Sequence, residues 1–521
     1  MSEPPSVPDT SAPESRSGGP IAVVLNTIEQ VGNRLPDPLT LFVIFATLVP
    51  LLSWLVSMTG WSVLHPATGK VVQVVNLLSP EQIRRMFTGA VENFTAFPPL
   101  GTVLVALLGI GVAERSGLVA ALLRSLVMAV PAGWVTAVLV FAGINSSLAA
   151  DAGFVVLPPL GAVLFAGLGR HPIAGLCAAF AGVSGGFSAN LLLTSLDPLL
   201  AGFTQSAAQL YDPSYQVAPT ANYYFMFVSV FLLTFVGWLV TDRIVEPRLG
   251  SWDASGFEGG IPQMSVPGPE EGRAVGWAVA SFLTVLAGFV LLTVPDGAVL
   301  RAADGGFAPF YQSLVPMIAI AFFVPGLVYG ILTGSIRDDR TVARMTGETM
   351  ATMGSYIVLA FAAAQFVAYF GWSNLGLMLA IGGADFLKGI GLAGIPLLLL
   401  FILFASLVDL LIASASAKWA VMAPVFVPML MSLGYSPELV QAAYRVADSF
   451  TNVITPLMPY FPIIIAFAQK YDPKLRLGTL IASMLPYSIG FGISWIGLFI
   501  FWYLFNLPLG PGAPLLYGPA R

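Results

Sequence analysis

Runs of apolar residues long enough to cross a lipid bilayer recur along the whole of this 521-residue chain. A membrane helix needs about 20 consecutive apolar residues; the first such run is Pro38–Met58 and the last is Ile481–Phe505. Only 9% of the residues are charged and 57% are hydrophobic, whereas soluble domains contain about 25% charged residues. The sequence therefore indicates an all-α polytopic membrane protein and excludes the weakly alternating pattern of a membrane β-barrel.

Chemistry that depends on cysteine or histidine has few residues to build on. Cys177 is the sole cysteine, so it cannot form an internal disulfide. His65 and His171 are the only histidines, which argues against zinc chemistry and serine–histidine catalysis. No stretch is basic enough to hold nucleic acid. We expect no cofactor, no metal beyond sodium, no nucleic-acid partner and no enzymatic activity.

The order of the runs predicts two similar halves separated by a polar, Gly/Pro-rich linker. The N-terminal tail is polar and rich in proline and serine, which predicts disorder rather than a signal peptide. The predicted divisions are a disordered cytoplasmic tail (1–30), a first membrane helix with an external loop (31–85), repeat 1 (86–248), the linker with two connecting membrane helices (249–344), repeat 2 (345–506) and a C-terminal tail (507–521). Within these divisions Gly60–Arg85 is predicted to be the external loop and Ser335–Thr349 a charged loop.

Each predicted repeat contains a hairpin followed by a broken helix. The hairpins, about 132–168 and 395–430, have apolar arms too short to cross alone, so they are predicted to re-enter the membrane. The broken helices, about 172–206 and 437–468, are interrupted by Gly, Pro, Ser and Asn. Irregular backbone at membrane depth is tolerated only where protein buries it or where it lines a wet cavity.

The repeats run in opposite directions through the bilayer when Lys and Arg near the span ends are assigned to the cytoplasm. This topology has about nine membrane helices, a cytoplasmic N-terminus and an external C-terminus. The letters also repeat weakly: Ser147–Pro159 aligns with Ser416–Pro428, and Ala178–Asn190 aligns with Ala442–Asn452. An inverted repeat of hairpins and broken helices is the architecture of secondary transporters.

Small polar residues gather at the hairpin tips and helix breaks. Unwound carbonyls with hydroxyl and amide oxygens suit small cations. The alternative is that these side chains only satisfy broken backbone groups or allow close helix packing. The candidate cation-binding residues are Asn145, Ser146, Ser188, Asn190, Ser414, Thr451 and Asn452.

Arg445 and Asp448 are ionisable residues inside the second broken helix, where charge is costly and indicates function. They are three positions apart, so on a helix they share a face and are predicted to pair. Arg445 suits a bidentate clamp on a carboxylate, and Asp448 then suits a proton carrier. The alternative is a neutral pair with a purely structural role.

Asp197 and Trp419 each allow two interpretations. Asp197 precedes Pro198 and is either a helix-capping carboxylate near the outer face or a protonatable partner of Asp448. Trp419 is either an interfacial residue or a stacking platform for an aromatic substrate. The remaining charges of these regions are interpreted as tip, interfacial or bundle-internal charges: Lys418, Asp151, Asp385, Lys388 and Asp409.

Four strings of letters closely resemble the AbgT family, the p-aminobenzoyl-glutamate transporters also described as antimetabolite (sulfonamide) exporters. They are S-A-S-A-K-W-A (414–420), A-A-Y-R-V-A-D-S-F-T-N-V-I-T-P-L-M-P-Y (442–460), A-G-V-S-G-G-F-S-A-N (181–190) and L-D-P-L-L-A-G (196–202). The match extends from about Val31 to Pro519. The resemblance implies a homodimer in the bacterial inner membrane with two re-entrant hairpins per protomer.

The resemblance also implies a set of functional positions: Asp197, Ser416, Trp419, Pro437, Arg445, Asp448 and Pro456. Two departures stand out. The first hairpin tip is Ser146-Ser147-Leu148 where relatives resemble Ser-Asn-Thr, which weakens the case for a cation site in that half. Lys418 stands where a neutral polar residue is common.

The expected function is proton-motive-force-driven efflux of p-aminobenzoyl-glutamate-type folate metabolites and sulfonamides across the lipid bilayer. Arg445 would hold an anionic group, Trp419 would stack on an aryl ring, and Asp197 and Asp448 would carry protons. One alternative is a sodium-coupled importer of p-aminobenzoyl-glutamate or a related carboxylate. Alternatives from other classes are a channel and an intramembrane aspartyl protease using Asp197 and Asp448.

Overall fold

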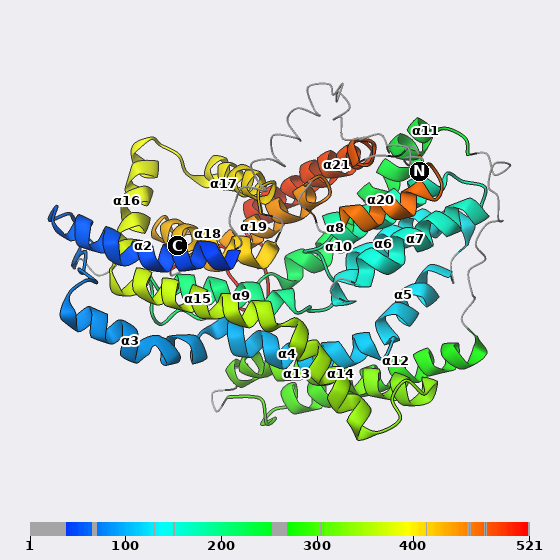
Figure 1. Cartoon of the computed structure of the whole chain (residues 1–521), viewed down its shortest axis with the longest axis horizontal. Helices are drawn as coiled ribbons and strands as arrows, with labels where there is room; N and C mark the ends of the chain where they lie inside the picture. The colour runs from blue at the N-terminus through cyan, green and yellow to red at the C-terminus, as the bar shows by residue number, and fades with distance from the viewer. Residues whose placement is uncertain are drawn as a thin grey trace, which may run out of the picture.

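A computed structural model of the chain confirms a membrane architecture built almost entirely of helices (Figure 1). The structure describes residues 38–64, 70–128, 131–149, 152–252, 268–302, 305, 307–412, 414–455, 458, 460–473, 475 and 477–518. The predicted disordered tail lies outside these residues, as do Asp151 and Pro456.

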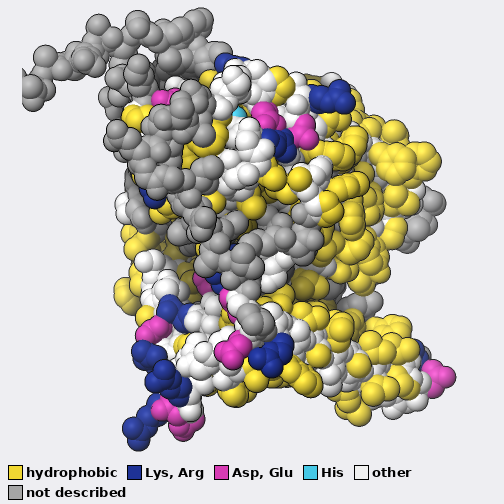
Figure 2. Space-filling view, turned by 90° about the vertical axis from the view of Figure 1, so that its right-hand side faces the viewer, with side chains coloured by type: hydrophobic (Ala, Val, Ile, Leu, Met, Phe, Trp, Pro, Cys, Tyr) yellow, Lys and Arg dark blue, Asp and Glu magenta, His cyan; other side chains and the backbone are white. Residues whose placement is uncertain are grey.

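Seven helices of the described part are long and apolar enough to cross a membrane. They include the helices α2 (Pro38–Ser57), α10 (Tyr223–Val240), α12 (Pro269–Thr293), α13 (Ala308–Thr333), α15 (Gly354–Trp372), α18 (Ala415–Ser432) and α21 (Leu477–Leu504). Many of their large apolar side chains are exposed, such as Trp277 at 65% and Leu291 at 70% on α12. Figure 2 shows hydrophobic side chains covering much of the right side of the view, with charged side chains gathered mainly along the top and at the lower left. Such a surface suits lipid.

The first predicted hairpin and broken helix are both present as separate short helices. The hairpin consists of α6 (Val135–Asn145), the 3₁₀ turn η2 (Ser146–Ala149) and α7 (Ala152–Gly167). The helix after it is interrupted. Helix α8 (Pro172–Gly185) ends at the pair Gly185-Gly186, and α9 (Leu196–Ala208) begins after ten intervening residues, 186–195.

The second hairpin and broken helix repeat this arrangement, except that the arm α18 is long enough to cross a membrane, so the prediction of a short arm was wrong there. Helix α17 (Gly394–Asp409) and α18 form the hairpin, and α19 (Pro437–Asn452) and α20 (Phe461–Gln469) form the interrupted helix. Helix α19 packs against α8, α9, α17, α18 and α21, so it is the central helix of this half (Figure 1). Nearly all of its side chains are buried.

Two segments expected to be loops contain helices, and here the sequence interpretation was wrong. The expected external loop contains the antiparallel strands β1 (Ser62–Leu64) and β2 (Val71–Gln73) and the helix α3 (Pro80–Thr95). The charged stretch expected to be a loop near 335–349 is mostly helix α14 (Asp339–Thr352). Its start is fixed by Asp338, whose carboxylate accepts a hydrogen bond from the Thr341 amide at 2.7 Å.

The remaining helices lie between these units. They are α4 (Pro98–Arg115), α5 (Leu118–Met128), the 3₁₀ turn η1 (Ala132–Trp134), the π-helical turn η3 (Thr241–Val245), α11 (Glu246–Leu249) and α16 (Leu375–Gly389). Helix α4 packs along α13, and α13 packs along α12, forming a layer on the lower side of Figure 1. Helix α9 contacts α4 from this layer and α18 from the second hairpin, so it lies between them.

The C-terminal segment 507–518 is packed rather than extended away from the protein. The amide of Tyr224, at the start of α10, donates to the Leu509 carbonyl at 2.9 Å. The amide of Ser436, just before α19, donates to the Leu515 carbonyl at 3.0 Å. The Tyr517 hydroxyl donates to the Asp212 carboxylate at 2.9 Å. This segment therefore ties the start of a repeat 1 helix to the start of a repeat 2 helix.

Helices α7 and α8 touch through backbone at Gly161 and Gly175, which gives a first testable prediction. A Cβ atom added at Gly175 would lie 2.2 Å from the Gly161 carbonyl oxygen. Gly175→Ala should therefore destabilise the protein by about 1–3 kcal/mol, the usual cost of overpacking. Thermal unfolding in detergent checks this, with Gly288→Ala on α12 as the matched control, because no atom lies within 4 Å of its added Cβ. Equal melting temperatures for the two variants would contradict the close approach.

Candidate functional site

Helix α19 carries the polar residues at the centre of the protein. Its start is fixed by Ser436, whose hydroxyl accepts a hydrogen bond from the Leu439 amide at 3.1 Å, and by Pro437 in the first turn. Further along, Gln441, Arg445 and Asp448 follow one another at helical spacing, and all are buried. Buried charge at membrane depth is expensive and needs a partner. Arg445 and Asp448 each pair with an opposite charge on another helix, whereas Glu438 accepts a hydrogen bond from the Tyr215 hydroxyl at 2.9 Å.

Arg445 pairs with Asp197 rather than with Asp448, so the predicted pairing within α19 was wrong. The Arg445 Nη2 atom lies 2.6 Å from Asp197 Oδ1. The other Asp197 oxygen accepts hydrogen bonds from the Thr194 amide at 2.6 Å and the Thr194 hydroxyl at 3.0 Å. Asp197 lies in the first turn of α9. It therefore holds the segment that precedes α9 and also joins the break of repeat 1 to the central helix of repeat 2.

The Arg445 guanidinium keeps hydrogen-bonding capacity after pairing with Asp197. Its Nε and Nη1 atoms are buried and have no hydrogen-bond partner among the described residues. Buried polar groups are normally satisfied, and an unsatisfied donor is costly. Two unsatisfied donors on one planar cation are suited to bind a carboxylate or another anionic group. In this conformation the guanidinium is only 1% exposed, so such a group reaches it only when the helices separate.

Asp448 pairs with Lys418, and Lys418 also pairs with Asp409. Lys418 Nζ lies 2.6 Å from Asp448 Oδ1 and forms a second ion pair with Asp409 Oδ1. The three side chains come from α19, α18 and α17 and are all buried. We call these three residues the charge cluster. The Asn452 side-chain amide donates a hydrogen bond to Asp448 Oδ2, the carboxylate oxygen that does not contact Lys418, at 3.2 Å.

The sequence interpretation placed Lys418 and Asp409 outside the candidate site. They are bundle-internal, which was one of the interpretations considered, but they also contact the functional candidate Asp448. Their positions on either side of the predicted hairpin tip could have indicated this contact. Asp409 is the last residue of α17 and Lys418 lies in the first turn of α18, so the hairpin tip brings the two side chains together. Asp385 and Lys388, at the end of α16, are exposed and lie outside the site.

Trp419 is fully buried, which excludes its interpretation as a residue of the membrane interface. Its indole nitrogen donates to the Thr204 hydroxyl on α9 at 2.9 Å. Its ring stacks on Tyr444, with centroids 4.5 Å apart and an interplanar angle of 24°. Tyr444 thus covers one face of the indole, and Trp419 connects α18 with α9 and α19.

The candidate cation ligands divide into two groups. Several of them bond to local backbone, as expected where helices are interrupted: the Ser146 hydroxyl donates to the Gly143 carbonyl at 2.7 Å and the Thr451 hydroxyl to the Ala447 carbonyl at 2.7 Å. Two other oxygens, Ser188 Oγ and Asn452 Oδ1, are buried without a hydrogen-bond partner in the described part of the chain.

The hairpin tips and breaks also bond to one another. The Asn145 side-chain oxygen accepts from the Leu191 amide at 3.1 Å, and Ser147 donates to Asn190. Both contacts join the first hairpin tip to the break after α8. At the second tip the Ser414 and Ser416 hydroxyls lie 3.4 Å apart, and Ser414 also caps α18 through the Ala417 amide. Ser416 is half-buried at this tip.

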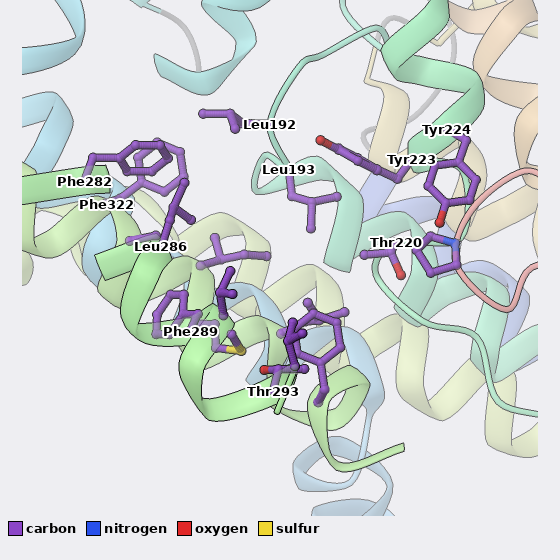
Figure 3. Close-up of a pocket in the computed structure, with 18 residues that line it drawn as sticks. Leu192, Leu193, Thr220, Tyr223, Tyr224, Phe282, Leu286, Phe289, Thr293 and Phe322 are labelled. Atoms are coloured by element: carbon purple, nitrogen blue, oxygen red, sulfur yellow. The ribbon is translucent and has the colours of Figure 1, made fainter. Parts of the chain in front are cut away.

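A cavity of about 560 Å³ lies beside the break of the first interrupted helix (Figure 3). Figure 3 shows Phe282, Leu286 and Phe289 of α12 on one side, Tyr223 and Tyr224 on the other, and Leu192 and Leu193 between them. The Tyr223 hydroxyl donates to the Leu191 carbonyl at 2.9 Å. The cavity is therefore apolar and adjoins the segment that leads into Thr194 and Asp197.

Two interrupted helices that bring opposite charges to one buried centre define a membrane transport protein. Comparison with known proteins identifies the family. Residues 23–517 match the family described as "AbgT putative transporter family", and the chain belongs to this family. The protein is accordingly a transporter and not an enzyme, which removes the protease alternative.

Three relatives cover nearly the whole chain. The p-aminobenzoyl-glutamate transport protein of Escherichia coli (strain K12) is 38% identical over 508 residues, covering 96% of this chain and 98% of that protein. The crystal structure of the Alcanivorax borkumensis YdaH transporter has a TM-score of 0.86 at 46% identity, covering 91% of this chain and 100% of that one. The Neisseria gonorrhoeae MtrF structure, described as illuminating a class of antimetabolite efflux pumps, has a TM-score of 0.89 at 47% identity, covering 94% and 100%.

Proposed function

We propose that the protein exports p-aminobenzoyl-glutamate-type folate metabolites and sulfonamide antimetabolites, driven by the proton-motive force. The relatives support the substrate class, since one is named for p-aminobenzoyl-glutamate transport and another for antimetabolite efflux. The observation that carries the proposal is the Arg445 guanidinium. It has two donors without a hydrogen-bond partner among the described residues, and its ion pair with Asp197 joins repeat 2 to repeat 1.

The proposed binding mode uses the polar and aromatic groups around α19. The free Arg445 donors would bind a substrate carboxylate or sulfonyl oxygens. The stacked Trp419 and Tyr444 lie on neighbouring helices and would separate to receive an aryl ring. The apolar cavity beside Leu193 would hold the ring on its way to this site. Because Asp197 and Arg445 are sealed from solvent, substrate entry and exit require alternating access.

The proposed location is the bacterial inner membrane, with the N-terminus in the cytoplasm and two protomers per assembly. Basic residues that the sequence assigns to the cytoplasmic side pair with acidic residues of other segments, so these segment ends lie together, as the proposed topology requires. The pairs are Arg115–Glu348 (2.7 Å), Arg124–Glu271 (2.5 Å) and Arg170–Asp242 (2.6 Å). Lys and Arg near span ends favour the cytoplasmic side.

Sodium-coupled import of p-aminobenzoyl-glutamate or a related carboxylate is a second candidate function. The unsatisfied oxygens of Ser188 and Asn452 favour it, because buried oxygens at helix breaks suit a small cation. Under this alternative the flux of substrate would follow a sodium gradient and would ignore a pH gradient.

Transport by purified protein in proteoliposomes tests the proposal. Labelled p-aminobenzoyl-glutamate and a labelled sulfonamide are supplied while the pH and sodium gradients are varied independently. We expect saturable movement of both compounds that follows the pH gradient and persists without sodium, with protein-free liposomes as the control. Flux that requires sodium would establish the importer, and an absence of saturable flux of either compound would refute the substrate class.

A further inference from the structure

The charge cluster of Asp409, Lys418 and Asp448 does not balance its own charge. Two carboxylates surround a single ammonium group, so the cluster has a formal charge of −1. The three side chains are 0%, 0% and 1% exposed, so bulk water does not solvate this charge. A buried charge without compensation is strongly unfavourable, and such groups bind a proton or another cation instead.

The neighbouring groups do not supply the missing positive charge. Helix α17 packs against α18 and α19. The ionisable groups that these helices contribute here are Lys418, Tyr444, Arg445 and Asp448, and the Arg445 charge is already matched by Asp197. The Tyr444 hydroxyl is uncharged and points to the Ala415 carbonyl and, at 3.4 Å, to Asp448. The cluster therefore requires one further positive charge while it remains buried.

A proton fits this position better than a metal ion. The Lys418 ammonium already occupies the place between the two carboxylates. A sodium ion beside it would face strong repulsion at low dielectric and would also need several oxygen ligands. A proton adds almost no volume and requires one carboxylate oxygen.

Asp409 has the oxygen that is available for this proton. Its Oδ2 atom is buried and has no hydrogen-bond partner among the described residues, although the Thr451 side chain lies nearby. Asp448, by contrast, uses both oxygens: Oδ1 contacts Lys418 and Oδ2 accepts from Asn452. The contact geometry thus assigns the proton to Asp409 rather than to Asp448.

We propose that Asp409 carries the coupling proton of the transport cycle, and that Lys418 neutralises Asp448 so that the cluster binds one proton. This inference rests on the proposed function, since it names the coupling residue of the same transporter. Protonated, the cluster is neutral and stable between α17, α18 and α19. When the proton leaves to water, the remaining negative charge is stable only when hydrated, so proton release is coupled to separation of the second hairpin from α19.

The variant Asp409→Asn tests this assignment, because it mimics the protonated side chain and leaves Lys418 paired with Asp448. In this variant the cluster stays neutral and holds the second hairpin against α19, so substrate counterflow at equal pH and accumulation driven by a pH gradient should both fall about tenfold or more. Asp385→Asn, an exposed carboxylate at the end of α16, is the matched control and should change neither rate. Unchanged pH-driven accumulation in Asp409→Asn would overturn the assignment.

A second measurement does not depend on any substrate. Infrared difference spectra of the purified protein between acid and alkaline pH should contain the carbonyl band of a buried protonated carboxyl group. The band should disappear in Asp409→Asn and shift in Asp409→Glu. A band that persists unchanged in both variants, or no such band in the unmodified protein, would overturn the proposal. If the band behaves as expected but neither labelled compound is transported, the proposed substrate class fails and the proton site stands.

Discussion

Replacement of Arg445 by Met should abolish transport and lower the stability of the protein together. The substitution removes the donors proposed to bind substrate and leaves the Asp197 carboxylate buried without its 2.6 Å partner. Removal of one member of a buried ion pair costs about 3–5 kcal/mol, because the other charge stays desolvated. Substrate flux in proteoliposomes and thermal unfolding in detergent measure the two effects on the same preparation.

A double variant separates the structural and functional parts of this effect. Arg445→Met combined with Asp197→Asn removes both charges, so most of the lost stability should return. Transport should remain abolished, because the substrate-binding cation is still missing. Recovery of transport in the double variant would show that Arg445 acts only as a counter-ion for Asp197. A single variant as stable as the unmodified protein would show that the pair is not buried.

Lys418→Met should give the second large effect, a loss of stability that depends on pH. The substitution leaves Asp409 and Asp448 close together without a cation, which should cost about 3–5 kcal/mol when both are ionised. The buried carboxylates then favour their protonated forms, so the folded variant binds protons more tightly than the unfolded chain does. Its stability is therefore greatest at acid pH and falls as the pH rises. Melting temperatures across a pH series measure this slope.

Two comparisons make the Lys418 prediction specific. Lys388→Met removes an exposed lysine from α16 and should leave the melting temperature and its pH dependence unchanged. Lys418→Met combined with Asp409→Asn leaves one carboxylate in place of two and should reduce the slope. A pH dependence of Lys418→Met that matches that of Lys388→Met would refute the buried cluster.

The breaks in the membrane helices could be predicted from sequence because they are local features. Gly185-Gly186 and Thr451-Asn452 mark positions where a helix ends, and α8 and α19 end there in the structure. Prolines alone were a weaker signal, because Pro424 and Pro428 lie inside the continuous helix α18. The partners of the charged residues could not be predicted in the same way. Arg445 and Asp197 are 248 positions apart, and the nearer Asp448 offered a simpler pairing. Only the fold shows that α9 brings Asp197 to the central helix.

Helices α3 and α14 were missed for a different reason. Both are rich in charged and polar residues, so neither has the apolar length of a membrane span. Their helix-start signals, Ser79-Pro80 and Asp338, were present in the sequence. An assignment based on hydropathy cannot separate the two cases, because a polar helix and a polar loop have similarly low hydropathy, so these helix-start signals received too little weight.

The packed C-terminal segment has a consequence for how the protein is made. Its residues Leu509 and Leu515 bond to the starts of α10 and α19, and these helices belong to different repeats. Because residues 507–518 follow both repeats in the chain, they are synthesised after α10 and α19, and the bonds that join these two helices form only after both repeats have been made. A chain truncated before residue 507 therefore lacks the bonds that join the starts of α10 and α19.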